Sequence, residues 1–241
     1  MSDVLGLGNF VVDLIGKPIE RLPAPGQLQM LDALETHVGG NGPNTAGALA
    51  KLGGSVAVCG RIGDDFQGRF LLQQLEAWGA DVTPVVCDER RQTGMTLVAV
   101  NRAGERSFLH DYGANAAFSP ADVPWDAPAL RGVRHLHLAS HFVLPAMDGE
   151  PAACVLRRAR ERGWSTSLDT VWDFSGRGLE ALQPCLPYAR AGSCRTTRRR
   201  GNSPAKTPRR RRPASFASWA RTRWWSSSAS AAATPPASGA N

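Results

Sequence analysis

Residues 37–54 read "HVGGNGPNTAGALAKLGG", a glycine-rich turn that runs directly into an Ala- and Leu-rich segment. Glycine allows positive φ angles and lets another molecule approach the backbone amides. Pro43 suits the first turn of a helix, because its missing N–H would have no partner there. The stretch therefore predicts a ligand-contacting turn at Gly39 and Gly40 that leads into the N-terminus of a helix.

On either side of this turn, short strands and helices alternate along the chain. Apolar, β-branched runs predict buried strands, and apolar residues at helical spacing predict amphipathic helices. Such alternation is typical of an α/β fold in which helices cover a mainly parallel sheet and ligands bind at the carboxyl ends of the strands. The predicted strands cover 4–15, 55–59, 82–87, 135–139 and 164–169, and the predicted helices follow Pro43 and cover 66–78 and 151–162.

Two further features suggest a binding site. Asp13 lies inside the first predicted strand. A carboxylate so close to a buried strand either faces solvent at the strand end or is held there to accept hydrogen bonds from a polar ligand. Residues 93–115 contain two extended runs around an Asn-Arg-Ala-Gly turn, which predicts a hairpin with one face free to cover a ligand.

The net charge of +7 is unevenly distributed over the 241 residues. Residues 190–241 contain 12 of the 28 Lys and Arg residues and no Asp or Glu, so residues 1–189 carry 16 basic against 21 acidic residues. After about Tyr188 the sequence has no sustained apolar periodicity and is rich in Arg, Ser, Ala and Pro, a composition typical of disorder. We therefore predict an ordered domain over 1–188 and a disordered tail over 189–241.

A shift of reading frame near residues 188–191 would account for this change of composition. GC-rich codons chosen for residues 194–232 and read two bases later can encode an acidic amphipathic helix followed by a strand. We expect on this basis that the tail is out of frame and that the C-terminal part of the fold is missing.

The cysteine content and the hydropathy of the sequence indicate in which cellular compartment the protein is expected. The five cysteines are odd in number and form no C-x-x-C pair, which argues against a disulfide framework and against a zinc site. The N-terminus has no basic and then apolar leader, and no apolar stretch approaches the roughly 20 residues that span a bilayer. We expect a cytoplasmic protein without a membrane partner or a metal site.

Several motifs together resemble the N-terminal signature of the ribokinase-like, or PfkB, carbohydrate kinases. They occur in family order, and the resemblance covers residues 4–188. It predicts a ribokinase-like fold, with a mainly parallel sheet covered by helices and a small β-sheet lid. The motifs are the early strand with Asp13, Gly-Gly-x-x-x-Asn at 39–44, Gly-x-x-Gly-Asp-Asp at 60–65, Trp-Gly-Ala at 78–80, Gly-Ala-Asn at 113–115 and "SLDTVWD" at 167–173.

This resemblance implies ATP-dependent phosphorylation of a sugar or nucleoside hydroxyl, with ATP and Mg²⁺ as cofactors. Asp13 and Asn44 would bond sugar hydroxyls, while Gly39 and Gly40 would let the sugar lie against the backbone. A polyol that leaves water needs such partners, because burial without them is costly. The 93–113 hairpin matches the family's lid, which excludes water, and two chains could associate through their lids.

A second group of polar residues has two open interpretations. Near predicted strand ends, a single polar side chain can reach the sugar or can serve the structure alone. His135 and His137 alternate on a strand without a third ligand at metal spacing, so we interpret them as structural. The residues that could reach the sugar are Arg61, His110, His141 and Asp169, together with Asn115, for which turn stabilisation is an alternative.

The family's second signature, a Gly-Ala-Gly-Asp turn whose Asp is the general base, does not occur in this sequence. The resemblance then implies that the ATP site is largely missing, that the chain contains no catalytic residue and that it is inactive, since phosphoryl transfer depends on such positioning. Two other functions stay open. One is a non-catalytic sugar-binding protein, and the other is a nucleic-acid-binding protein whose Arg- and Trp-containing tail would also bind polyanions nonspecifically.

Overall fold

A computed structural model describes residues 2–173, 176–189 and 191–194 of the chain. Its larger sheet has five strands in the order β11-β10-β9-β1-β4, and every neighbouring pair is parallel. The predicted α/β class with a mainly parallel sheet is thus confirmed. The strands are β1 (Val4–Leu7), β4 (Val56–Cys59), β9 (His135–His141), β10 (Ser165–Thr170) and β11 (Ala191–Cys194).

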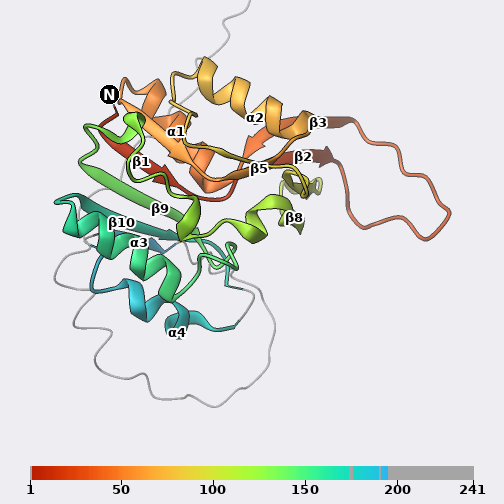
Figure 1. Cartoon of the computed structure of the whole chain (residues 1–241). Coiled ribbons are helices and arrows are strands. Elements are labelled where there is room, and N and C mark those ends of the chain that lie inside the picture. The colour runs from red at the N-terminus through yellow and green to blue at the C-terminus, as the bar shows by residue number, and fades with distance from the viewer. Residues whose placement is uncertain (1, 174–175, 190, 195–241) are drawn as a thin grey trace, which may run out of the picture. The chain divides into compact units, whose positions relative to one another are not determined.

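Helices cover both faces of this sheet (Figure 1). Helices α1 (Asn41–Lys51) and α2 (Phe66–Ala77) lie on one face, and α3 (Glu150–Glu161) and α4 (Gly178–Leu182) lie on the other. Alternate strand residues point to opposite faces, so each face has its own apolar core. Leu5, Leu7 and Leu138 belong to the core under α3, and Val56 and Val58 to the core under α1 and α2.

Helix α3 illustrates how the sequence forms these elements. Pro151 lies in its first turn, where its missing N–H costs nothing. Arg158 and Arg160 lie in its last turn, where positive charge is favourable beside the negative end of the helix dipole. Its buried residues recur at helical spacing and pack on the sheet: Ala152, Ala153, Val155, Leu156 and Ala159.

A second sheet of four strands has the order β3-β2-β7-β8. Strands β7 (Gly94–Val100) and β8 (Arg106–Asp111) form the predicted antiparallel hairpin, whose role as a lid stays a prediction. The same sheet also contains β2 (Val11–Lys17) and β3 (Ala33–Gly39), which pair antiparallel to each other. We refer to these four strands as the lid sheet.

Two details of the predicted strands are wrong. The single strand expected over 4–15 is two strands in different sheets, because residues 8–10 between β1 and β2 belong to neither strand. The strand expected over 82–87 reduces to β6 (Val86–Asp88), which pairs with β5 (Arg61–Gly63) in a small separate sheet. The remaining short elements are the 3₁₀ helices η1 (Gly113–Ala117), η2 (Pro120–Asp122), η3 (Pro128–Leu130) and η4 (Gln183–Cys185).

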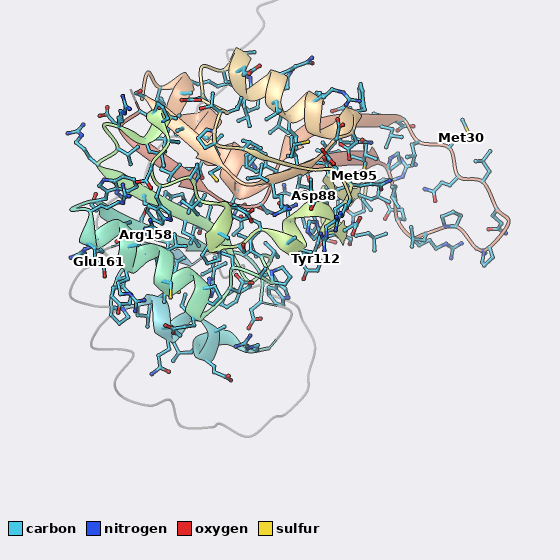
Figure 2. The ribbon with its side chains drawn as sticks, viewed as in Figure 1. Met30, Asp88, Met95, Tyr112, Arg158 and Glu161 are labelled. Carbon is cyan, nitrogen blue, oxygen red and sulfur yellow. The ribbon has the colours of Figure 1, made fainter. Side chains whose placement is uncertain are left out.

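The segment between β2 and β3 projects away from the body of the protein (Figure 1). Figure 2 shows Met30 on this segment. Leu28 and Met30 are 87% and 80% exposed. Association of two chains through the lid stays a prediction.

The boundary expected between residues 188 and 189 differs in the structure. Strand β11 pairs in parallel with β10 beyond that boundary, at residues 191–194. Backbone hydrogen bonds to an open strand edge do not require an apolar pattern, so composition could not reveal this strand. The rest of the predicted disordered tail lies outside the described residues. No helix in the described ranges is long and apolar enough to cross a membrane.

His135 and His137 connect β9 to β10, in agreement with their predicted structural role. Both ring nitrogens of His135 lie 2.8 Å from serine hydroxyls, those of Ser165 and Ser167. His137 Nδ1 lies 2.8 Å from Ser167 Oγ. Burial, with a smaller contribution from the positive charge of His135, lowers the pKa of His137 to about 4.

The stability of the fold should therefore decrease as the pH falls from about 6.5 to about 4. In this range the unfolded chain binds a proton at His137 that the folded chain excludes, which costs at most about 1.4 kcal/mol per pH unit. His137→Asn keeps a polar atom near the Nδ1 position but does not titrate, so urea unfolding at pH 7 and pH 4.5 should show a smaller loss of stability. A loss as large in His137→Asn as in the unmodified chain would contradict this account.

Candidate functional site

A group of polar side chains gathers where β1, β9 and β10 end and α1 begins. Asn9 follows β1, and its Oδ1 accepts hydrogen bonds from Ser140 Oγ at 2.5 Å and from the Asn41 backbone N at 2.9 Å. Asn41 Nδ2 donates to Asp169 Oδ2 at 3.1 Å. We call Asn9, Asn41, Ser140 and Asp169 the strand-end cluster. It joins three strands to the start of one helix.

The backbone at Ser140 is held in an uncommon conformation. Ser140 has φ 72° and Phe142 has φ 86°, a region that residues other than glycine rarely adopt. Asp148 stabilises this turn by accepting hydrogen bonds from the backbone N of Phe142 at 3.0 Å and of Leu144 at 3.2 Å. The turn aims the fully buried Ser140 hydroxyl at Asn9, so the strain serves to build the cluster.

Helix α1 begins in this cluster. Gly40 precedes it with φ 81°, and a Cβ atom there would overlap the carbonyl oxygen of Asn9. Only glycine fits this position without strain. No acidic residue lies in the first turn of α1, and the acidic side chain next to the positive end of the helix dipole is that of Asp169, which accepts a hydrogen bond from Asn41.

The lid sheet contributes a row of four polar residues. Asp13 on β2 pairs with His37 on β3 and with Thr96 on β7, and Thr96 pairs with His110 on β8. Directly paired residues of neighbouring strands point to the same face. We call His37, Asp13, Thr96 and His110 the lid row.

Asp13 lies against the backbone of Gly39. A Cβ atom on Gly39 would be 2.5 Å from Asp13 Cγ and 2.5 Å from its Oδ2, so only glycine leaves room for the carboxyl group. Burial raises the pKa of Asp13, and a hydrogen bond from Thr96 and the nearby charge of His37 oppose this rise. Because Gly39, Gly40 and Asn41 are consecutive, this carboxyl group and the strand-end cluster lie along one stretch of backbone.

Gly39→Ala should lower the free energy of unfolding by about 1–3 kcal/mol, because the new methyl group forces the Asp13 side chain or the strand to move. Urea unfolding measures the loss. Gly6→Ala is the matched control in β1. The nearest atom to a Cβ there is Val58 Cγ2 at 3.8 Å, so its effect should be smaller. Equal losses in both variants would contradict the proposed close approach at Gly39.

Asn44 lies in the first turns of α1, and its backbone N donates to the Gly40 carbonyl oxygen at 3.1 Å. Its side chain is exposed at the same end of the helix as Gly40. The structure therefore brings Asp13, Gly39, Gly40 and Asn44 to one region. Their contact with a ligand stays a prediction.

Of the second group of predicted residues, Asp169 and His110 join this region, and three others do not. Arg61 binds Asp88 Oδ2 through Nε at 3.0 Å and Asp122 Oδ1 through Nη1 at 2.8 Å, a structural ion-pair network. His141 is fully buried, and its Nε2 lies 3.2 Å from the Ala181 carbonyl oxygen. Both positions fit the structural alternative.

Asn115 is the third predicted residue that does not join this region. Its Nδ2 donates to the carbonyl oxygens of Phe10 at 2.8 Å and Tyr112 at 2.9 Å, and its Oδ1 accepts from Phe10 N at 2.7 Å. Both amide hydrogens are therefore used, and the side chain is fully buried. These bonds favour the structural alternative for Asn115, which fixes the chain between β1 and β2 to the segment after β8.

Sequence reasoning missed Asn9, Asn41, Thr96 and Ser140. Asn9 directly follows an apolar strand, and Asn41 lies inside the glycine-rich stretch 37–54. The local sequence around each of them could therefore have indicated a site residue. The position of Thr96 depends on strand register, which the sequence pattern left open. Ser140 depends on a positive φ angle that is unusual for serine.

Within the described ranges no group of three or more His, Cys, Asp or Glu residues could hold a metal ion. The Gly-Ala-Gly-Asp turn is also absent from the sequence. The arrangement is instead suited to a neutral ligand with several hydroxyl groups, because it offers a carboxylate, amide groups and exposed backbone close to glycine.

Comparison with known proteins agrees with this geometry. The profile of the pfkB family carbohydrate kinases matches residues 1–191. An ATP-dependent ribose-1-phosphate kinase from Halopiger xanaduensis is 30% identical over 169 residues, which cover 70% of this chain and 54% of that protein. A fructokinase from Escherichia coli is 32% identical over 185 residues, which cover 76% of this chain and 55% of that protein.

A solved structure has the same fold. The fructokinase with bound ATP from Xylella fastidiosa superimposes with a TM-score of 0.63 at 24% sequence identity, over 80% of this chain and 61% of that chain. The chain spans about half the length of the curated relatives reported above.

Proposed function

The chain belongs to the pfkB family of carbohydrate kinases, and on this premise we propose that residues 1–191 form the sugar-binding part of an ATP-dependent sugar kinase. The observation that carries the proposal is the carboxyl group of Asp13 packed against Gly39. The names of the related proteins refer to ribose 1-phosphate and to fructose. A pentose or a hexose is therefore the proposed ligand.

Asp13 supplies the chemistry that a sugar requires. A carboxylate accepts hydrogen bonds from two adjacent hydroxyls, and charge-assisted bonds of this kind are the stronger ones. Gly39 and Gly40 have no side chain between the sugar and the backbone. The exposed amide of Asn44 can both donate and accept, so it matches either orientation of a further hydroxyl.

Asp169 and His110 are proposed as additional contacts. Asp169 holds Asn41 at the start of α1, at the same end of the helix as Gly40. His110 lies on β8, in the lid row. The lid sheet would then cover the sugar and exclude water from it.

We further propose that the 241-residue chain by itself does not transfer phosphate. In the family, ATP donates its terminal phosphoryl group to a sugar hydroxyl, and the Gly-Ala-Gly-Asp turn that would position this reaction is absent here. With ATP, Mg²⁺ and each of ribose, deoxyribose and fructose, release of ADP should stay at the level measured without sugar. Sugar-dependent release of ADP would contradict this part of the proposal.

The altered reading frame near residues 188–191 is also a proposal, supported by the absence of Asp and Glu from residues 190–241. Sequencing the genomic DNA and the transcript across this junction tests it. An inserted or deleted base relative to an open frame that continues the family pattern would support the proposal. An uninterrupted frame whose product carries this tail would contradict it. The cytoplasmic location stays a prediction, and nucleic-acid binding by the tail concerns residues outside the described ranges.

Calorimetric titration tests the binding proposal. The full chain is titrated with ribose, deoxyribose and fructose, and with a simple alcohol as the control for nonspecific heat. Saturable heat with at least one sugar, and none with the alcohol, is the expected result. The absence of saturable heat with every sugar, in a sample shown by circular dichroism to be folded, would contradict a retained sugar site.

A further inference from the structure

A buried histidine and a largely buried aspartate form an ion pair beside the turn that contains Ser140. His141 is the last residue of β9 and is fully buried. Its Nδ1 atom lies 3.5 Å from Asp148 Oδ1, and no described residue forms a hydrogen bond with this nitrogen. Buried polar atoms without a hydrogen bond are uncommon, so the position of Nδ1 must be explained by the charges of the pair.

The protons of this pair follow from the other contact of the histidine ring. His141 Nε2 lies 3.2 Å from the Ala181 carbonyl oxygen, which only accepts hydrogen bonds, so Nε2 carries a hydrogen. In a neutral ring Nδ1 then has a lone pair, and this lone pair is repelled by an ionised carboxylate. One additional proton, on Nδ1 or on Asp148, turns the repulsion into attraction. The geometry therefore favours a pair that holds one proton.

Burial favours the same state. It raises the pKa of Asp148 and lowers the pKa of His141, because it disfavours an isolated charge on either group. With one proton the pair has no net charge, whichever residue carries the proton. With none or with two it has a net charge in a place that excludes water, which is costly.

Asp148 connects this pair to the strand-end cluster. Its two carboxylate oxygens hold two backbone N–H groups of the turn around Ser140, which has φ 72°. The Ser140 hydroxyl donates to Asn9 Oδ1, which also accepts from the backbone N of Asn41. A continuous series of contacts therefore leads from the pair to the first residue of α1.

We propose that His141 and Asp148 are positioning residues for the sugar site, which share one proton and in this state hold the turn that directs Ser140 toward the start of α1. The inference rests on the proposed function, because Gly40 precedes α1 and belongs to the proposed sugar site. Neither residue of the pair touches the sugar. Loss of the shared proton leaves a buried negative charge and two acceptors that face each other, which loosens the turn.

Five other titratable groups lie near the pair. They are Tyr112, Glu150, Asp173, Arg177 and Cys185. The positive charge of the guanidinium disfavours a proton on His141, and the negative charge of Asp173 favours it. The thiol and the phenol stay neutral, because burial and the negative charge of Asp148 raise the pKa of both groups. None of the five is therefore expected to exchange a proton near neutral pH.

An NMR titration provides the first test, and it needs no sugar. The ¹⁵N shifts of the His141 ring and the ¹³C shift of the Asp148 carboxyl carbon are followed in the full chain from pH 4 to pH 9. The inference expects hydrogen on Nε2 throughout and a change at both residues with one common midpoint, where the pair loses its proton. A neutral ring without hydrogen on Nε2 would overturn it. So would an Asp148 carboxyl group that titrates near the ordinary value of about 3.9 and does not respond to His141.

The backbone amides of the strand-end cluster show whether the pair positions it. The amides of Ser140 and Asn41 should shift with the same midpoint as the pair. This step should be absent in His141→Asn, which keeps a donor toward Asp148 but does not titrate. Glu150→Gln is the matched control, because it removes a charge from the exposed first residue of α3 and should leave the step unchanged. Amides that do not follow the pair would overturn the positioning role.

Sugar affinity provides the second test. In the unmodified chain it should fall about 10-fold as the pH rises through the midpoint of the pair, and in His141→Asn this fall should be absent. Protonation of Asp13 cannot cause it, because that proton binds as the pH falls. Below the midpoint, Asp148→Ala and His141→Leu should each weaken binding about 10-fold. Unchanged affinity in both variants, shown by circular dichroism to be folded, would overturn the inference.

The outcomes distinguish the two proposals. If the unmodified chain binds none of ribose, deoxyribose and fructose, the proposed function is contradicted, while the common midpoint and the amide shifts still decide whether the pair positions the start of α1. If sugar binds but its affinity does not change across the midpoint, the inference is overturned and the function stands. If Asp148→Ala or His141→Leu does not fold, His141→Asn and the unmodified chain supply the comparison.

Discussion

Asp13→Asn is expected to reduce sugar affinity at least 100-fold and to leave the fold intact. The change replaces one carboxylate oxygen by an NH₂ group, so one acceptor is lost and a donor faces the sugar hydroxyl. Hydrogen bonds to charged groups contribute about 1.5–3 kcal/mol each. The variant loses one such bond, the second bond loses its charge, and the new NH₂ group opposes the hydroxyl hydrogen, which together account for the roughly 2.7 kcal/mol that corresponds to 100-fold. Calorimetric titration with the best sugar of the panel measures the effect.

The thermal stability of this variant distinguishes binding from folding. Burial already disfavours the charged form of Asp13, so a neutral amide should keep or slightly raise the melting temperature. Asp111→Asn is the matched control. Asp111 belongs to the same sheet, but its position next to His110 in a strand places it on the opposite face. Equal losses of affinity in the two variants would contradict a specific role for Asp13.

Asn115→Ala is expected to show the largest loss of stability among polar substitutions discussed here, about 2–5 kcal/mol. The carboxamide makes three hydrogen bonds to the backbone of Phe10 and Tyr112 in a fully buried position. Its removal leaves these backbone groups without partners, and each such group costs about 1–3 kcal/mol. Urea unfolding followed by circular dichroism measures the change.

A surface asparagine supplies the control for this prediction. Asn101 lies in the turn of the lid hairpin, where its Nδ2 bonds Glu105 in an exposed position. Asn101→Ala should therefore cost less than about 1 kcal/mol. An Asn115→Ala variant with unchanged stability and lost sugar affinity would restore the ligand role that the structure argues against.

The local pattern of the sequence was sufficient for the body of the fold. Apolar runs at period 2 and period 3.6 located β4, β9, β10, α2 and α3 to within about two residues, because each of these elements buries one clearly apolar face. Strand β3 was missed because most of its residues are exposed and show no apolar alternation. A single strand was predicted over residues 4–15 because most of this run is apolar, although residues 8–10 separate β1 from β2.

The site could be predicted only in part, because some of its residues have a recognisable local sequence pattern and others do not. Asp13, Gly39 and Gly40 stand out as a carboxylate in an apolar strand and as adjacent glycines, which are local signals. Thr96 is an ordinary residue for a strand, and its role follows from the register of β2, β7 and β8. Asn115 has the chemistry of a ligand contact, and only its three backbone partners identify its structural role.

An NMR titration tests the central claim most directly. Backbone ¹H–¹⁵N spectra of the full chain are recorded with increasing concentrations of the sugar that gives the largest heat. A retained sugar site at the start of α1 predicts saturable shifts of the Gly39 and Gly40 amides and of residues next to Asp13, and their loss in Asp13→Asn. Shifts confined to other parts of the folded chain, or shifts at Gly39 and Gly40 that persist unchanged in Asp13→Asn, would contradict it.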